Sequence, residues 1–70
     1  MMPLAFVQNG EKNVIRKITG KDELRRHMAE LGFVVGETVT VIAKAGGNMI
    51  VSVKGTRIAI DPGMASRIMV

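Results

Sequence analysis

The periodicity of this chain predicts a mainly β fold with one short α-helix. Leu24, Met28 and Leu31 recur with helical spacing, so they share one face of a single helix. After Gly36 the apolar period changes from 3.6 to 2, and short alternating stretches follow one another to the C-terminus. Several short strands with tight turns in 70 residues are typical of a compact barrel. An SH3-like β-barrel fits best, because an OB-fold usually has a longer chain and longer strands.

The N-terminal half is expected to hold one strand and the helix. Residues 14–19 alternate as a first strand, after a segment that ends in a turn-like sequence. Asp22 is the expected N-cap of the helix, which continues to Leu31. A helix of about ten residues is not stable alone. Packing of its apolar stripe must therefore hold it in place.

The helix is expected to end at a glycine. Gly32 can adopt the left-handed conformation that terminates many helices, and Phe33 would then fold back near Met28. A second strand follows over residues 37–44. Its alternation places three side chains on one face: Val39, Val41 and Ala43.

The C-terminal half is expected to be a meander with a short helix. Ala45-Gly46-Gly47-Asn48 predicts a turn before a third strand over residues 49–54. Gly55-Thr56 fits a type II′ hairpin, because the first central position of that turn needs positive φ. A fourth strand follows over residues 57–61, with Ile58 and Ile60 inward.

The last segment is expected to be one helical turn and a final strand. Asp61-Pro62 looks like an N-cap followed by proline at the first helical position. The turn would run through Ala65, and the last strand would place Ile68 and Val70 on one face.

Composition limits the possible functions. Residues 1–70 form one expected domain, with no linker, repeat or apolar run near the ~20 residues that cross a bilayer. No cysteine is present, which excludes disulfides and cysteine-based zinc sites. The start lacks the basic region of a secretory signal. We therefore expect a cytoplasmic protein without membrane insertion.

The net charge of +4 allows an acidic partner, an anionic membrane surface or nucleic acid. Single-strand binders stack bases on aromatic side chains. Here only Phe6 and Phe33 could do so, and Phe33 is expected in the core. The basic residues could still contact nucleic-acid phosphates, but specific nucleic-acid binding is not expected.

The chain also resembles a known family. Three groups of residues carry the resemblance over nearly the whole chain: Leu24-Arg25-Arg26, Met28, Leu31-Gly32, Gly36, Val39 and Val41; then Val53, Gly55 and Ile58-Ala59-Ile60; then Ala65, Ile68 and Val70. They are similar to the FeoA family. The resemblance implies a small cytoplasmic SH3-like barrel that assists bacterial ferrous iron uptake through the membrane GTPase and permease FeoB. In that family the same domain also occurs at the C-terminus of iron-dependent transcriptional repressors. This chain has no helix-turn-helix segment, so the resemblance favours the stand-alone transport accessory protein.

Two segments depart from the family pattern. Many members carry a Pro-Leu-Gly-Asp-Pro-like loop where this chain has Ala45-Gly46-Gly47-Asn48. Asp61-Pro62-Gly63 replaces a stretch that is commonly basic in the family. A transporter contact at the first loop would therefore differ here.

The residues offer little support for catalysis. His27 is the only histidine, and its spacing from Ser52 and Ser66 does not indicate a triad. Gly46-Gly47 is not followed by the Lys-Ser/Thr of a phosphate-binding loop. We expect neither an enzyme nor a bound cofactor.

A metal site on the helix is an alternative. Glu23, His27 and Glu30 lie at i, i+4 and i+7, and a histidine with two carboxylates can hold Fe(II). Ordinary surface ion pairs of Asp22 or Glu23 with Arg26 also fit the spacing. Because one exposed helix rarely supplies supporting contacts, no metal site is predicted.

Basic residues give the candidate partner site. Lys21, Arg25, Arg26 and Lys44 could form a patch near the helix, or simply a solvated face. The predicted partner-binding residues are Arg25, Arg26 and Lys44. The leading function is a FeoB-binding accessory protein. The alternatives are a basic nucleic-acid-binding barrel and a stand-alone metal-responsive domain.

Overall fold

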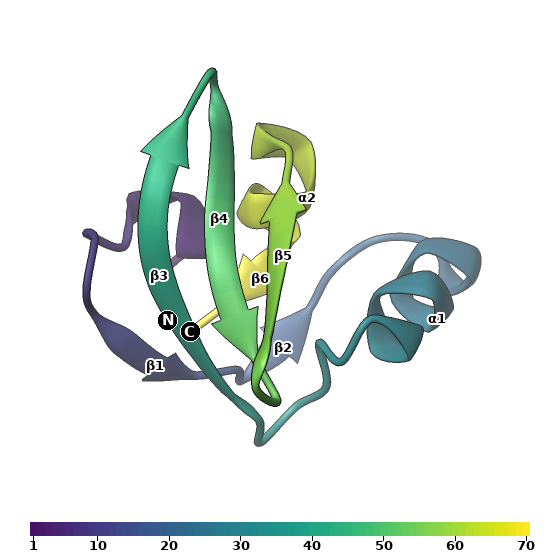
Figure 1. Cartoon of the computed structure of the whole chain (residues 1–70). Helices are drawn as coiled ribbons and strands as arrows, with labels where there is room; N and C mark the ends of the chain where they lie inside the picture. The colour runs from purple at the N-terminus through teal and green to yellow at the C-terminus, as the bar shows by residue number, and fades with distance from the viewer.

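The computed structural model describes residues 1–70 and shows strands gathered around one core, with a helix to one side (Figure 1). The elements in chain order are the 3₁₀ turn η1 (Leu4–Phe6), β1 (Lys12–Val14), β2 (Lys17–Ile18), α1 (Asp22–Glu30), β3 (Thr38–Ala45), β4 (Asn48–Val53), β5 (Thr56–Ile60), α2 (Pro62–Arg67) and β6 (Ile68–Met69). The mainly β class predicted from the sequence is confirmed.

The strands form two sheets, and their ladders do not close into a continuous barrel. Antiparallel strands in the order β1-β3-β4-β5 make the larger sheet, and β2 pairs with β6 in the smaller one. The expected single strand over residues 14–19 is wrong in detail. Ile15 N donates to Glu37 O, just before β3 of the larger sheet. The next residue, Arg16, donates its N–H to Met69 O in β6 of the smaller sheet. The first strand is thus split, because its chain passes from one sheet to the other.

A β-bulge in β3 changes which residues face inward. Val39 pairs with Val53 and Val41 with Val51, but the next pair is Ala43 with Ile50. One extra residue on β3 shifts the alternation there. The prediction that Ala43 continues the inward face of β3 is therefore wrong, since Ala43 is only half-buried.

Both hairpins of the meander use two-residue loops with positive φ at each central position. Gly46 and Gly47 have φ of 57° and 84° between β3 and β4. Lys54 and Gly55 have φ of 51° and 74° between β4 and β5. Positive φ at both positions defines a type I′ turn. The predicted type II′ turn at Gly55-Thr56 is therefore wrong, because Thr56 already pairs with Val53 in the ladder.

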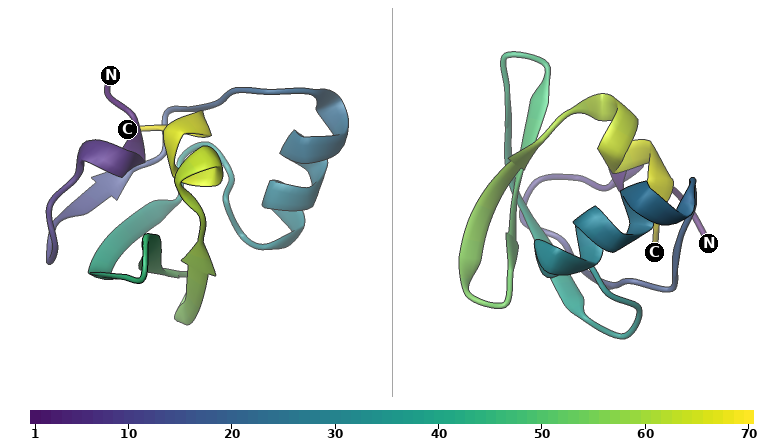
Figure 2. Two further views of the ribbon diagram at one scale, coloured as in Figure 1. Left: turned by 90° about the horizontal axis from the view of Figure 1, so that it is seen from above. Right: turned by 90° about the vertical axis from the view of Figure 1, so that its right-hand side faces the viewer.

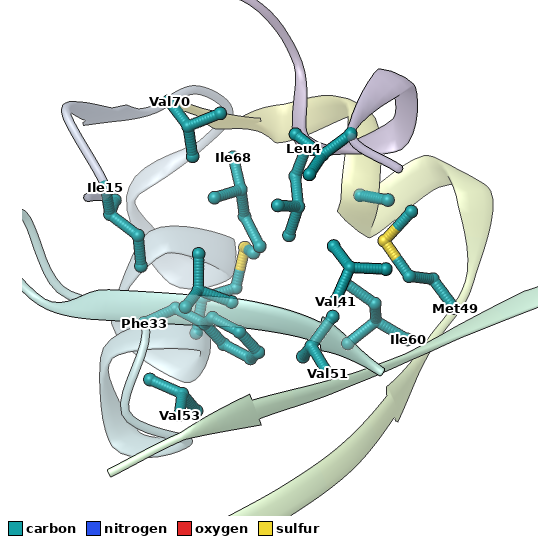
Figure 3. Packing of buried hydrophobic residues seen from close by; sticks show 14 residues of the cluster. Leu4, Ile15, Phe33, Val41, Met49, Val51, Val53, Ile60, Ile68 and Val70 are labelled. Atoms are coloured by element: carbon teal, nitrogen blue, oxygen red, sulfur yellow. The ribbon is translucent and has the colours of Figure 1, made fainter. Parts of the chain in front are cut away.

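The core draws on almost every element (Figure 3). Its members are Leu4, Val7, Ile15, Met28, Phe33, Val39, Val41, Met49, Val51, Val53, Ile60, Ala65, Ile68 and Val70. The N-terminal segment contributes more than its sequence indicated. Leu4 and Val7 are fully buried, and Met2 exchanges backbone hydrogen bonds of 2.9 and 2.8 Å with Val70. The two ends of the chain therefore lie side by side.

The short helix α2 begins as the sequence predicts. Asp61 is its N-cap, and the Oδ1 atom accepts a hydrogen bond of 2.8 Å from Met64 N. Pro62 occupies the first helical turn, where a missing N–H costs nothing. The helix continues to Arg67, beyond the predicted end at Ala65. It connects β5, at the edge of the larger sheet, to β6 of the smaller sheet, and these two strands are not hydrogen-bonded to each other (Figure 2).

Candidate interaction surfaces

Helix α1 is held to the protein by a narrow apolar stripe. Met28 is fully buried, and Leu24 and Leu31 pack half-buried against the core, as their spacing predicts. Seven of its nine residues are exposed: Asp22, Glu23, Arg25, Arg26, His27, Ala29 and Glu30. Figures 1 and 2 show the helix lying beside the sheets rather than inside them. Most of its surface is therefore free to meet another molecule.

The C-terminal end of α1 is fixed by a Schellman motif. Gly32 has φ of 108° and donates its N–H to Ala29 O at 3.0 Å. Phe33 N donates to Met28 O at 2.9 Å. These are the two hydrogen bonds that define the motif. Phe33 is buried, so the predicted glycine stop and the inward return of the chain are both confirmed.

The N-terminal end of α1 differs from the prediction. Lys21 is the N-cap residue, and no side chain caps the helix there. Asp22 is instead the first helical residue, so its predicted role as N-cap is wrong. Its carboxylate forms an ion pair with Arg25, one turn along the helix. The pairing of Arg26 with Asp22 or Glu23 that the spacing allowed is not formed.

The structure separates the predicted basic residues. Arg25 and Arg26 are exposed on α1, and Lys21 stands at its start, near Arg67. Lys44 lies near the far end of β3, where its Nζ atom is 3.5 Å from Ala5 O. Figure 1 places that end of β3 away from α1. Lys44 therefore belongs to a different surface from the two arginines.

The chemically active side chains do not converge. No group of three or more histidine, cysteine, aspartate or glutamate residues is close enough to hold a metal ion. Ser66 Oγ donates to Gly63 O at 2.8 Å within α2, whereas His27 makes no side-chain hydrogen bond. The triad geometry that hydrolysis needs is thus not assembled.

A groove that sequence reasoning missed lies beside Lys44. It has a volume of about 190 Å³ and is lined by Ala5, Lys44, Gly47, Asn48, Met49, Pro62 and Ala65. These residues come from η1, the β3–β4 hairpin and α2, so only the fold brings them together. Phe6 follows Ala5 and is 71% exposed, which is unusual for an aromatic side chain in this small protein.

None of the helices is long and apolar enough to cross a membrane. Phe33 is buried, as predicted, which leaves Phe6 as the one aromatic residue at the surface.

Comparison with known proteins identifies relatives along the whole chain. The model of a family described as the FeoA domain matches residues 2–70. A protein of Methanocaldococcus jannaschii named "Putative Fe(2+) transport protein A" is 37% identical over 70 residues, all of this chain and 85% of that protein.

Two solved structures are similar in both fold and sequence. A crystal structure of FeoA, described as an iron uptake regulatory protein, has a TM-score of 0.89 at 34% identity and covers 97% of this chain and 90% of that one. FeoA of Stenotrophomonas maltophilia in complex with zinc has a TM-score of 0.85 at 31% identity, covering 99% and 88%. It is described as an SH3 domain protein, and this likeness confirms the predicted SH3-like fold.

Proposed function

This chain belongs to the FeoA family, and from that premise we propose that it is an accessory protein of ferrous iron uptake. It acts from the cytoplasm by binding a FeoB-like GTPase and permease. Binding, rather than catalysis, is the activity that its side chains support, because its histidine and serines are not arranged for a reaction. The relative in M. jannaschii is named for Fe(2+) transport, which agrees with this role.

The exposed face of α1 is the proposed contact with the transporter. The observation that carries this choice is that α1 uses only its apolar stripe to join the core and leaves Arg25 and Arg26 exposed. Packing therefore does not explain why the arginines are there. Arg26 has no carboxylate within 4.0 Å, so its guanidinium can meet one on a partner. Arginine presents a planar set of donors suited to carboxylates.

Arg25 offers a second, exchangeable donor. Its ion pair with Asp22 is exposed, and exposed pairs contribute about 0–1 kcal/mol. A partner carboxylate could replace Asp22 at little cost in the free energy of folding. The two neighbouring arginines would then bind a pair of acidic residues on the transporter.

A double charge reversal tests the α1 contact. Arg25→Glu with Arg26→Glu should abolish co-purification with the membrane transporter, because attraction becomes repulsion at the interface. The fold should survive, since exposed substitutions usually change stability by less than about 0.5 kcal/mol. Circular dichroism and thermal melting check that point.

The matched control is Lys12→Glu with Arg57→Glu, on the exposed faces of β1 and β5. Both double variants change the net charge equally, so long-range electrostatics is held constant. The control should still co-purify. A folded α1 variant that co-purifies as well as the parent would exclude this face. Failure of both variants would show that net charge, not α1, determines binding.

A further inference from the structure

The groove beside Lys44 combines an apolar floor with a cationic rim. Met49 and Ala65 line the groove and are almost completely buried. Ala5 and Pro62 close it from η1 and α2. Gly47 of the β3–β4 turn faces open space, because a Cβ there would meet nothing within 4 Å. The space is therefore open to solvent above an apolar surface.

Lys44 supplies a positive charge that the chain does not neutralise. Its only hydrogen-bond partner is Ala5 O at 3.5 Å, the outer limit for such a bond. The two ion pairs of the protein are Arg25 with Asp22 and Lys54 with Glu37, so no carboxylate lies within 4.0 Å of Lys44. Asp61, next to Pro62, is already engaged as the N-cap of α2. The ammonium group is thus free to pair with an anion beside the groove.

The size of the groove limits its occupant. Small-molecule sites usually have volumes of about 300–1,000 Å³, whereas this groove has about 190 Å³. That space suits one aliphatic side chain rather than a cofactor or nucleotide.

We propose that this groove is a second docking site, which binds an acidic segment of a partner protein through one aliphatic side chain. The side chain lies on Met49 and Ala65, and a flanking carboxylate pairs with Lys44. The site does not depend on the proposed α1 contact, because Lys44 and α1 lie on different parts of the surface. A partner that bound the α1 face and the groove at the same time would bind more tightly than at either site alone, because the second contact would be intramolecular.

Three short peptides test the chemistry on the isolated protein. The probe is an acetylated and amidated Glu-Leu-Asp tripeptide. The uncharged Gln-Leu-Asn peptide keeps the aliphatic anchor, and the Glu-Ser-Asp peptide keeps the charges. Backbone amide shifts are followed by NMR during each titration. Saturable shifts are expected at Ala5, Gly47 and Asn48 with the first peptide, and at least about fivefold weaker binding with the other two.

Variants separate the charge from the fold. Lys44→Gln should weaken binding of the Glu-Leu-Asp peptide roughly fivefold. The matched control Lys12→Gln removes the same charge from exposed β1 and should leave binding unchanged. The proposal is overturned if the shifts spread over other surfaces, if the three peptides bind alike, or if both lysine variants behave alike. Because α1 is intact in all of these proteins, the outcome is distinct from that of the α1 test.

Discussion

The β3–β4–β5 meander and helix α1 are built in opposite ways. The meander joins its strands by antiparallel ladders, interrupted only by the bulge in β3, and buries Val39, Val41, Val51 and Val53 almost completely. Helix α1 buries only Met28 fully, although it has nine residues. Its N-terminus has no side-chain cap, whereas the shorter α2 is capped by Asp61. The meander therefore supplies most of the buried core, whereas α1 presents exposed charged side chains.

This difference indicates where the protein tolerates change. Buried side chains in a small core are costly to alter, because the total stability of such a domain is only about 5–15 kcal/mol. Exposed helix residues can vary with little effect on folding. A surface that recognises another protein is therefore expected on α1 or at the groove, and not on the buried side of the meander.

Gly32 and Phe33 connect the two regions. The Schellman motif ends α1, and the Phe33 ring enters the core between α1 and the meander (Figure 3). A Cβ on Gly32 would lie 3.5 Å from Val53 Cγ1, so the end of the helix touches β4. Substitutions at this junction test whether α1 and the meander are coupled.

The largest effect is expected from Phe33→Ala. Removing a buried aromatic ring usually costs about 3–5 kcal/mol, because it leaves a cavity. Against a total of about 5–15 kcal/mol this loss is a large share of the free energy of unfolding, and α1 should lose its attachment to the core. Chemical denaturation measures it, and Phe33→Leu is the control that keeps most of the apolar volume. If Phe33→Ala unfolded at the same denaturant concentration as the parent, the junction would not link the two regions.

A smaller loss is expected from Gly32→Val. A β-branched side chain at φ of 108° is strained by about 1–3 kcal/mol, although a Cβ atom alone would make only ordinary contacts there. Thermal melting should show the loss as a lower Tm. Gly32→Asn should restore part of it, because asparagine tolerates positive φ better than other residues. Equal Tm values for the valine variant and the parent would contradict the assigned helix end.

The smallest effect is expected from Lys54→Asn, and it is a gain. Lys54 is the one non-glycine residue with positive φ, at 51°, and Asn-Gly is the favoured sequence for a type I′ turn. Relief of strain should add about 0.5–1 kcal/mol, or roughly 2–8 °C in Tm. The lost contact with Glu37 offsets little, because its N–O distance of 3.9 Å is long and Lys54 is exposed.

Lys54→Gln is the control for this turn. It removes the same charge but keeps the strained backbone, so it should not stabilise the protein. A lower Tm for Lys54→Asn would mean that the contact with Glu37 matters more than the turn.

Predictions from sequence succeeded where local chemistry decides the structure. The Gly32 stop, the Asp61-Pro62 start of α2 and the Leu24-Met28-Leu31 stripe each depend on a few adjacent residues. Periodicity also located both ends of each of the three meander strands to within one residue. The wrong N-cap at Asp22 is also a local matter. The helix begins one residue earlier than predicted, so Lys21 is the N-cap and Asp22 is the first helical residue.

The errors arose where distant parts of the chain meet. The bulge in β3 depends on register with β4, and the split of the first strand depends on pairing with β6. The separation of Lys44 from Arg25 and Arg26 follows from the folding of the chain, which spacing along the sequence does not reveal. The groove combines residues from position 5 to position 65, so no local pattern could have found it.

The sequence by itself determined the fold class, the helix end and the apolar stripe, because these follow from short-range backbone preferences and periodic burial. It also indicated the family, through the resemblance of particular residues along the chain. Only the tertiary structure decided that the strand ladders stay open, that Leu4 and Val7 are buried, and that Lys44 lies apart from Arg25 and Arg26. The physical reason is that burial, ladder register and charge proximity are set by contacts between segments far apart in the chain.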